Sequence, residues 1–160
     1  MIYVFERDAK DGDTFYTFLT SDNVEYLITL SPSFWNIAKN VYEMTMSNES
    51  DAIKNIAGYD KCIAPTICAI LLDFLTTDLS IAIGYVCESI DRQSRGKARA
   101  KLFLKWFDAA KREDFIHLQG ITFLDEFNQE YHSDIIFQKD NPDSDLIQEN
   151  FYTINQENSK

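Results

Sequence analysis

The run Leu79-Ser80-Ile81-Ala82-Ile83-Gly84-Tyr85-Val86-Cys87 is a nearly continuous apolar segment of strand length. A strand with one exposed face alternates apolar and polar residues, whereas a strand covered on both faces does not. We therefore expect Leu79–Cys87 to be a central strand of a sheet, with other elements packed on both of its faces.

Four strands are expected before this run. Residues 2–5, 14–20 and 24–30 are rich in β-branched and aromatic residues and are separated by turn residues at 11–13 and 21–23. The segments 14–20 and 24–30 are predicted to form a hairpin. Residues 40–47 alternate between two sides, which is typical of a strand.

Helices and a second hairpin are expected around and after the central run. Pro65 suits the first turn of a helix that runs to about Thr76, because apolar residues recur there at helical spacing. A basic helix is predicted from Arg92 to Lys111. Residues 115–124 and 130–139 then form a hairpin, and a short closing helix follows residues 141–143.

The order β-β-β-β-α-β-α-β-β-α predicts an α+β fold. We expect a mixed, mainly antiparallel sheet with two main helices packed on one face. The 160 residues suffice for one domain, which we place at residues 1–151, with a polar C-terminal tail at 152–160.

The composition narrows the class of protein. The formal charge of −11 argues against general nucleic-acid binding, which requires net positive charge. Asp73 and Asp78 interrupt the most apolar stretch, so no membrane span is expected. Three cysteines in apolar surroundings indicate reduced thiols and a cytoplasmic location. The spacing of Cys62 and Cys68 does not match a zinc site, and we expect neither a metal nor a cofactor.

The basic residues are concentrated in one place. Eight of the fifteen Lys and Arg residues lie between Arg92 and Arg112. Arg92, Arg95 and Arg99 fall in the first turns of the expected helix, where the helix dipole already disfavours positive charge. A carboxylate of the fold or a bound anion should therefore lie opposite them.

Helical spacing separates these arginines from the solvated lysines. Arg99 precedes Phe103 by four residues and Trp106 by seven, and Arg95 precedes Arg99 by four, so both extend the apolar stripe of the helix. One interpretation is a partly buried salt-bridge cluster with Glu88, Asp91 or Asp73. The other is an anion site at the carboxyl end of the central strand. The candidate ligand-binding residues are Arg92, Gln93, Arg95, Gly96 and Arg99.

The segment Gln93-Ser94-Arg95-Gly96-Lys97-Ala98 also matches the short pattern by which GNAT-type acetyltransferases hold the pyrophosphate of acetyl-coenzyme A. Backbone N–H groups at a helix start bind phosphate, so the chemistry is sound. That fold continues into another strand and helix, whereas a hairpin is expected here. The motif is short, and an acetyltransferase remains an alternative.

No catalytic residue is assigned, and whether the protein is an enzyme stays open. Cys87 ends the central strand, but no base is identifiable beside it, so a packed thiol is the favoured interpretation. His117 and His132 lie on the two strands of the last hairpin. We expect them to be ordinary strand residues, one partly buried and one exposed.

The chain resembles a family of small proteins from Bacteroidota bacteria that is known as a domain of unknown function. The residues that carry the resemblance are Tyr16, Phe18, Thr20, Glu25, Tyr26, Thr66, Ile67, Ile70, Asp73, Phe74, Asp91, Arg92, Gln93, Arg95, Arg99, Phe103, Trp106, Phe107 and Lys139-Asp140-Asn141-Pro142. The resemblance implies a cytosolic bacterial protein whose most distinctive segment is Asp91–Phe107. It supplies no activity.

Three functions remain in view. The leading hypothesis is a non-enzymatic or regulatory protein that recognises an anionic small molecule or an acidic protein segment through Arg92, Arg95 and Arg99. The alternatives are an acetyltransferase-like enzyme that uses Gln93–Ala98, and a homodimer whose basic helix meets an acidic surface on its partner without any small ligand.

Overall fold

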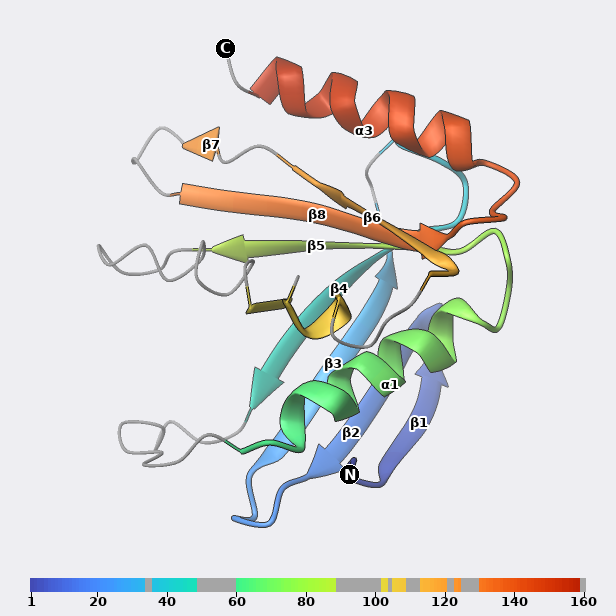
Figure 1. The fold of residues 1–160 in the computed structure, drawn as a ribbon. Coiled ribbons are helices and arrows are strands. Elements are labelled where there is room, and N and C mark those ends of the chain that lie inside the picture. The colour runs from blue at the N-terminus through green and yellow to red at the C-terminus, as the bar shows by residue number, and fades with distance from the viewer. Residues whose placement is uncertain are drawn as a thin grey trace.

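The computed structural model describes residues 1–33, 36–48, 60–88, 102–103, 105–108, 113–120, 123–124 and 130–158. Its elements are β1 (Phe5–Lys10), β2 (Asp13–Leu19), β3 (Glu25–Pro32), β4 (Val41–Asn48), α1 (Ile63–Leu75), β5 (Ala82–Glu88), β6 (Phe115–Gln119), β7 (Phe123–Leu124), β8 (Glu130–Gln138) and α3 (Ser144–Asn158) (Figure 1). Residues 102–103 and 105–108 are also helical, and we call them the 102–108 segment. The predicted α+β fold and its order of strands and helices are confirmed.

All the strands join in one mixed sheet, in the order β1-β2-β3-β4-β5-β8-β6, with β7 also paired to β8. Among the described strand pairs, β4 and β5 are the one parallel pair, and Val41 lies opposite Ala82 in their register. The other pairs are antiparallel. The carboxyl ends of β4 and β5 therefore lie at the same edge of the sheet.

The first strand begins later than the sequence pattern predicts. It covers Phe5–Lys10 rather than residues 2–5, and its Lys10 pairs with Asp13 across a two-residue turn. Asp11 and Gly12 adopt φ values of 55° and 92°, the left-handed conformation that such tight hairpin turns require. The turn brings the polar residues before it into pairing with β2, although these residues have low strand propensity. Pairing with the neighbouring strand therefore outweighs their intrinsic preference.

The central position of β5 is confirmed. It lies between β4 and β8, and Ala82, Ile83 and Tyr85 are all at most 2% exposed. Ile83 and Tyr85 belong to the core on one face of the sheet, whereas Ala82 belongs to the core on the other face. The apolar residues on both sides of the strand explain why its sequence lacks alternation.

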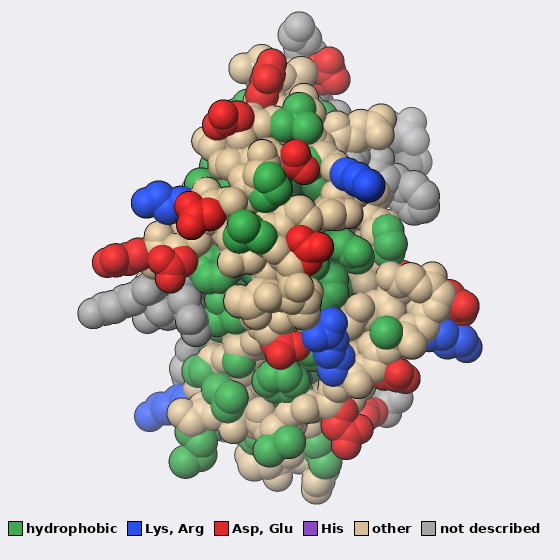
Figure 2. Space-filling view, turned by 90° about the vertical axis from the view of Figure 1, so that its right-hand side faces the viewer, with side chains coloured by type: hydrophobic (Ala, Val, Ile, Leu, Met, Phe, Trp, Pro, Cys, Tyr) green, Lys and Arg blue, Asp and Glu red, His purple; other side chains and the backbone are tan. Residues whose placement is uncertain are grey.

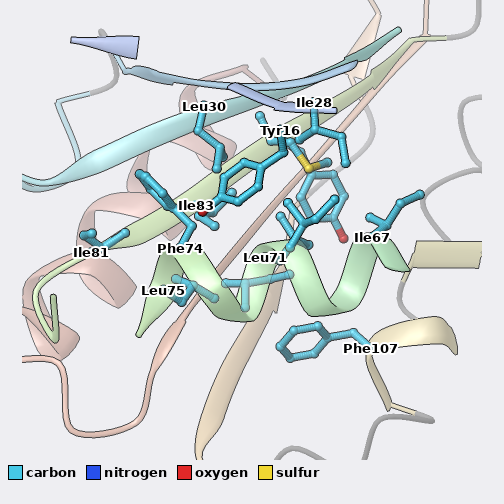
Figure 3. Packing of buried hydrophobic residues seen from close by; sticks show 14 of the residues in the cluster. Tyr16, Ile28, Leu30, Ile67, Leu71, Phe74, Leu75, Ile81, Ile83 and Phe107 are labelled. Atoms are coloured by element: carbon cyan, nitrogen blue, oxygen red, sulfur yellow. The ribbon is translucent and has the colours of Figure 1, made fainter. Parts of the chain in front are cut away.

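The larger core lies between the sheet and α1. Ile67, Leu71 and Phe74 of α1 meet strand residues such as Tyr16 and Ile28, and all are at most 3% exposed (Figure 3). Phe107 of the 102–108 segment joins the same cluster from another side of α1. α1 and the described part of the second predicted helix therefore share one face of the sheet, as expected.

The closing helix α3 covers the opposite face. Its Ile147 and Phe151 pack with Leu118, Ile135 and Phe137, which belong to β6 and β8. The helix continues to Asn158, so residues 152–158, which we expected in a polar tail, are helical. Half-buried Ile154 adds to the same core and gives this extension a packing contact.

The second hairpin is confirmed. Gln119 pairs with Asp134, and Phe123 pairs with Tyr131, so four residue steps from β6 to β7 match three on β8. Residues 121 and 122, between these two pairs, lie outside the described part of the chain.

The surface mixes side chains of all kinds. On the face shown in Figure 2, acidic, basic and hydrophobic groups are interspersed, and the basic side chains of the described residues are scattered singly. None of the helices in the described part of the chain is both long and apolar enough to cross a membrane.

The packing of α1 predicts a large cost for truncating its buried face. Leu71 is 2% exposed, so we expect Leu71→Ala to lower the free energy of unfolding by about 3 kcal/mol. Leu146→Ala, at a helical position that is 46% exposed, is the matched control and should change it by less than about 1 kcal/mol. Urea unfolding of both variants measures the difference. Equal effects would contradict the assigned core.

Candidate functional site

The arginine site predicted from the sequence lies outside the described residues. This applies to Arg92, Gln93, Arg95, Gly96 and Arg99, and to the Gln93–Ala98 motif as a whole. The structure does place the two ends of this stretch. The chain leaves β5 at Glu88, at the edge that β4 and β5 share, and it is described again from Leu102.

The carboxyl end of β5 lies beside the start of β8. Cys87 is opposite His132 and Glu88 is opposite Tyr131 in the antiparallel register. His132 is 8% exposed, so the expectation that one of the two histidines is exposed is wrong. The histidine is buried because it lies on the same sheet face as Tyr85 and Asp134, the face that α1 and the 102–108 segment cover.

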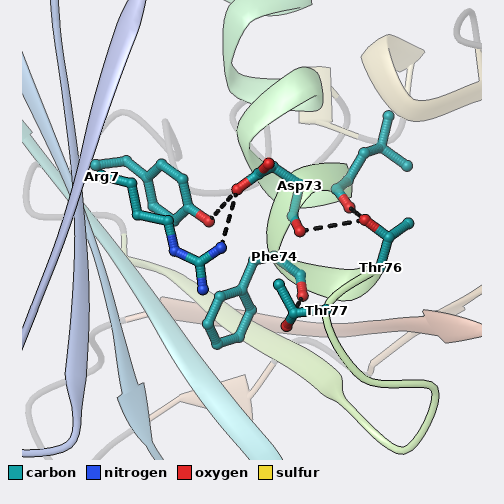
Figure 4. A network of polar contacts seen from close by, with 7 residues as sticks. Arg7, Asp73, Phe74, Thr76 and Thr77 are labelled. Atoms are coloured by element: carbon teal, nitrogen blue, oxygen red, sulfur yellow. Dashed lines mark hydrogen bonds and ion pairs between the residues drawn. The ribbon is translucent and has the colours of Figure 1, made fainter.

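Asp73, one of the expected partners of the arginines, has other partners. Its Oδ2 accepts hydrogen bonds from the Tyr16 hydroxyl at 2.6 Å and from Nη1 of Arg7 at 3.3 Å (Figure 4). The Arg7 guanidinium also lies over the rings of Tyr16 and Phe74, at 5.6 and 5.9 Å from their centroids. This cluster fastens the edge strand β1 to α1.

Burial raises the pKa of Tyr16 well above its ordinary value of 10.0. The hydrogen bond to Asp73 and the negative charge of that carboxylate raise it further, and Arg7 partly opposes them. The phenol therefore keeps its proton throughout the neutral range and serves as a fixed donor.

Other residues that carry the family resemblance also serve the fold. The hydroxyl of Thr66 accepts a hydrogen bond from the Tyr3 backbone N–H at 2.9 Å and donates one to the Cys62 carbonyl at 2.6 Å. The side chain of Asn141, 4% exposed, donates to the Ile81 carbonyl at 3.2 Å and so fastens the start of α3 beside β5. The hydrogen bonds of Thr66 and Asn141 therefore stabilise the fold.

A second polar cluster is buried between the sheet and the 102–108 segment. The Tyr85 hydroxyl, Nε2 of His117 and Oδ2 of Asp134 form a triangle with all three separations at 3.0 Å. The side chains of His117 and Asp134 are each 7% exposed, and Tyr85 is 2% exposed. The other carboxylate oxygen of Asp134 accepts the backbone N–H of Gly120 at 3.1 Å.

Each member of this cluster is positioned by the sheet. Tyr85 lies directly opposite Asp134 on neighbouring strands, and His117 is opposite Ile136, one side-chain step further along the same face. Gly120 directly follows β6, and its N–H also donates to the Ser133 carbonyl at 2.7 Å. The backbone just after β6 thus supplies a donor to Asp134.

Aromatic side chains cover the cluster. The ring of Phe103 lies 5.3 Å from that of Tyr85, and the ring of Phe107 lies 5.8 Å from that of His117 in an edge-on arrangement. Trp106 lies 5.3 Å from Phe103. Asp134 is only 5% exposed, so its carboxylate depends on its three donors for stabilisation.

The sequence analysis did not predict that Tyr85, His117 and Asp134 are in contact. The sequence of β8 nevertheless contains one indication of the cluster. His132, Asp134 and Ile136 alternate along one side of β8, so a polar pair lies on a face that otherwise packs against the core. A buried Asp needs donors, and Tyr85 and His117 are the donors that the strand register supplies. That pairing depends on the non-local order β5-β8-β6, which local patterns do not reveal.

The chemistry open to the cluster is hydrogen bonding and proton exchange. Within the described ranges, no group of three or more His, Cys, Asp or Glu side chains is arranged to hold a metal ion. A His–Asp pair in which the carboxylate holds one ring nitrogen leaves the other nitrogen to face a ligand.

The raised pKa of Tyr16 predicts a pH dependence. The folded protein keeps the phenol proton at pH values where the unfolded chain, with a pKa near 10.0, loses it. This contribution to the free energy of unfolding is complete below pH 10 and decreases as the pH rises above 10, by at most about 1.4 kcal/mol per pH unit. Tyr16→Phe should remove this slope in urea unfolding, and Tyr152→Phe, at a position 50% exposed, should not. Identical slopes for the two variants would disprove the assignment.

The Tyr85 hydroxyl donates to a buried carboxylate, so its removal should be costly. We expect Tyr85→Phe to lower the free energy of unfolding by about 2 kcal/mol, the usual range for a hydrogen bond to a charged group. Tyr152→Phe is again the exposed control, with an expected change close to zero. Chemical unfolding at pH 7 measures both. A Tyr85→Phe protein as stable as the control would show that Asp134 does not need this donor.

Comparison of the sequence with known proteins identifies a family, but no activity is known for that family. Neither the curated proteins nor the solved structures contain a significant match to this chain. The model of a family described as "Family of unknown function (DUF6169)" matches residues 59–153. The match begins just before α1 and ends within α3, so it includes β5, β6, β8 and the buried Tyr85–His117–Asp134 cluster. The chain therefore belongs to the DUF6169 family, whose function is unknown.

Proposed function

We propose that this protein binds an anionic group at the sheet edge where β4 and β5 end, and that it acts as a binding or regulatory protein. Arg92, Arg95 and Arg99 are the proposed contacts, together with Gln93 and Gly96. The ligand is an anionic small molecule, such as a nucleotide, or an acidic protein segment. The resemblance of the sequence to a bacterial family supports a cytosolic setting.

The parallel pairing of β4 and β5 is the observation that carries this proposal. In open α/β sheets, ligands bind outside the carboxyl ends of the parallel strands, and we extend this rule to the one parallel pair described here. The chain enters the arginine-containing stretch directly after β5 ends at Glu88. An anion there would relieve the repulsion among closely spaced guanidinium groups, and Arg is well suited to bidentate contacts with phosphate or carboxylate.

The charge distribution gives further support. A protein with a formal charge of −11 repels anions over most of its surface. A local basic site is then the place on the surface to which an anion is directed. Asp73, one of the acidic groups that could neutralise the arginines, already contacts Arg7 and Tyr16.

Thermal unfolding with a panel of anions tests the proposal. Inorganic phosphate, AMP, ATP, acetyl-coenzyme A and a short acidic peptide serve as probes at matched ionic strength. At 100 times its dissociation constant, a ligand stabilises the folded state by about 2.7 kcal/mol. We expect one or more phosphate-bearing probes, or the peptide, to raise the melting temperature. The response should disappear in the Arg95→Ala/Arg99→Ala variant.

Lys10→Ala/Lys139→Ala is the matched control, because both lysines are exposed and the variant loses the same charge. It should keep the response of the original protein. A response to acetyl-coenzyme A alone would favour the acetyltransferase alternative. If no probe changes the melting temperature and the protein sediments as a dimer, the homodimer without a small ligand becomes the favoured function. Loss of stability in the arginine variant without any ligand response would identify a structural salt-bridge cluster.

A further inference from the structure

One part of the sheet has a helix on only one of its two sides among the described elements. α1 lies in front of β1, β2 and β3, whereas α3 lies beside β6 and β8 at the other end of the sheet (Figure 1). The core under α3 contains no residue of β1, β2 or β3. We call the side of these three strands that points away from α1 the open face.

Apolar side chains are neighbours on the open face. Burial alternates along β2 and β3, so every second side chain points away from the core under α1. Thr17 lies opposite Leu27 in the pairing of these strands, and Phe15 and Leu19 are two positions to either side of Thr17. Val4 directly precedes β1, and the register of β1 with β2 places it beside Leu19.

These side chains are unusually accessible for apolar residues of a sheet. Val4 is 90% exposed and Leu19 is 53% exposed, while Phe15 and Leu27 are half-buried. Single apolar residues on a surface are ordinary, but neighbouring ones with a polar rim are typical of an interaction site.

The rim of this apolar patch is acidic. Glu6, Asp8 and Glu25 are exposed, and each lies directly beside a patch residue or Thr17 in the strand register. The basic residues of β1, β2 and β3, which are described in full, are Arg7 and Lys10. Arg7 contacts α1 on the other side of the sheet, so Lys10 alone offsets the three carboxylates on the open face.

The acidic rim determines which occupant fits the patch. A symmetric contact between the open faces of two copies would bring like charges together. Nucleic acids and anionic membranes are repelled for the same reason. A protein segment with an apolar stripe and flanking Lys or Arg side chains complements both the patch and its rim.

The basic stretch of a second copy lacks a free apolar stripe. Its Phe103 and Phe107 pack in the core of their own molecule, and Phe107 is only 5% exposed. The helix α3 shows how a suitable stripe binds the same side of this sheet, because Ile147, Phe151 and Ile154 recur at helical spacing and pack against it. A helix from another protein would continue this layer over β1, β2 and β3.

We propose that the open face is the docking surface for a cationic amphipathic helix of a partner protein. The apolar stripe of that helix lies on Val4, Leu19 and Leu27, and its Lys or Arg side chains contact Glu6 and Glu25. This surface is distinct from the anion site proposed above, because it attracts positive charge and lies on strands that the anion site does not use.

Backbone NMR titrations with three designed peptides test the chemistry of the partner. The probe is an amphipathic leucine–lysine peptide. A leucine–glutamate peptide of equal length reverses its charge, and a serine–lysine peptide removes its apolar stripe. We expect saturable shifts of amide signals in β1, β2 and β3 with the leucine–lysine peptide, and at least tenfold weaker binding of the other two.

Three results of these titrations would overturn the proposal. One is the absence of binding by the leucine–lysine peptide, and another is binding that shifts the signals of α3 instead of those of β1, β2 and β3. The third is equal affinity for either of the other peptides, which would show that positive charge or the apolar stripe is not required.

The Val4→Ser/Leu19→Ser variant tests the apolar patch. Both side chains are exposed, so the variant should fold as the original protein does, and we expect it to lose at least tenfold in affinity for the leucine–lysine peptide. Leu79→Ser/Leu146→Ser is the matched control, because these leucines are 47% and 46% exposed and lie outside the open face. An equal loss in the control would contradict the assigned surface.

The Glu6→Gln/Glu25→Gln variant tests the acidic rim. We expect weaker binding and a smaller effect of salt on the affinity, because two of the attracting charges are gone. Glu149→Gln/Glu157→Gln removes the same charge from exposed positions of α3 and should retain most of the affinity. Equal affinities of the two variants would disprove the role of the rim.

Sedimentation of the protein without peptide tests the competing occupant. We expect Val4→Ser/Leu19→Ser to leave the oligomeric state unchanged. A dimer that this variant dissociates would show that a second copy covers the open face, and would overturn the proposal of a separate cationic partner.

Discussion

The contact between α1 and the sheet is the constraint on which the rest of the structure depends. β4 and β5 are parallel, and parallel neighbours must be joined by a crossover that packs on the sheet. α1 is that crossover, and nine of its thirteen residues are buried. Because α1 lies on this face, β5 becomes central and its carboxyl end reaches the edge where the proposed anion site begins. Burial of Tyr16 beside Asp73, with its raised pKa, follows from the same contact.

A buried carboxylate is the second strong constraint. Asp134 lies on a strand whose neighbours Ile135, Ile136 and Phe137 are at most 2% exposed, and a charge in such surroundings is expensive unless it is paired. The fold supplies a hydroxyl, an imidazole and a backbone N–H, and the last of these belongs to Gly120, directly after β6. An apolar residue at this position would avoid the cost. The retained charge is consistent with a role in holding His117 in one tautomer and orientation.

The sequence was sufficient for the fold and insufficient for the site, for physical reasons. The unbroken apolar run around Ile83 requires a central strand, and the helical spacing of Ile67, Ile70 and Leu71 requires a helix on its face, so local patterns determined both. The late start of β1 was missed, because the Asp11–Gly12 turn imposes a register that the polar residues before it do not signal. The predicted contacts at Arg95 and Arg99 lie outside the described residues, so they remain a prediction.

The buried cluster shows why polar residues are harder to interpret than apolar ones. His117 and Asp134 are seventeen residues apart, and Tyr85 is a further thirty-two residues from His117. Their meeting follows from the insertion of β8 between β5 and β6, which no local pattern encodes. Apolar residues need only a face of the sheet, and periodicity predicts the face. Hydrogen-bonded residues need a particular neighbour at about 3 Å, and that depends on strand order and register together. A buried acid in an otherwise apolar strand is therefore the signal to look for, since it requires donors from strands that the sequence alone does not identify.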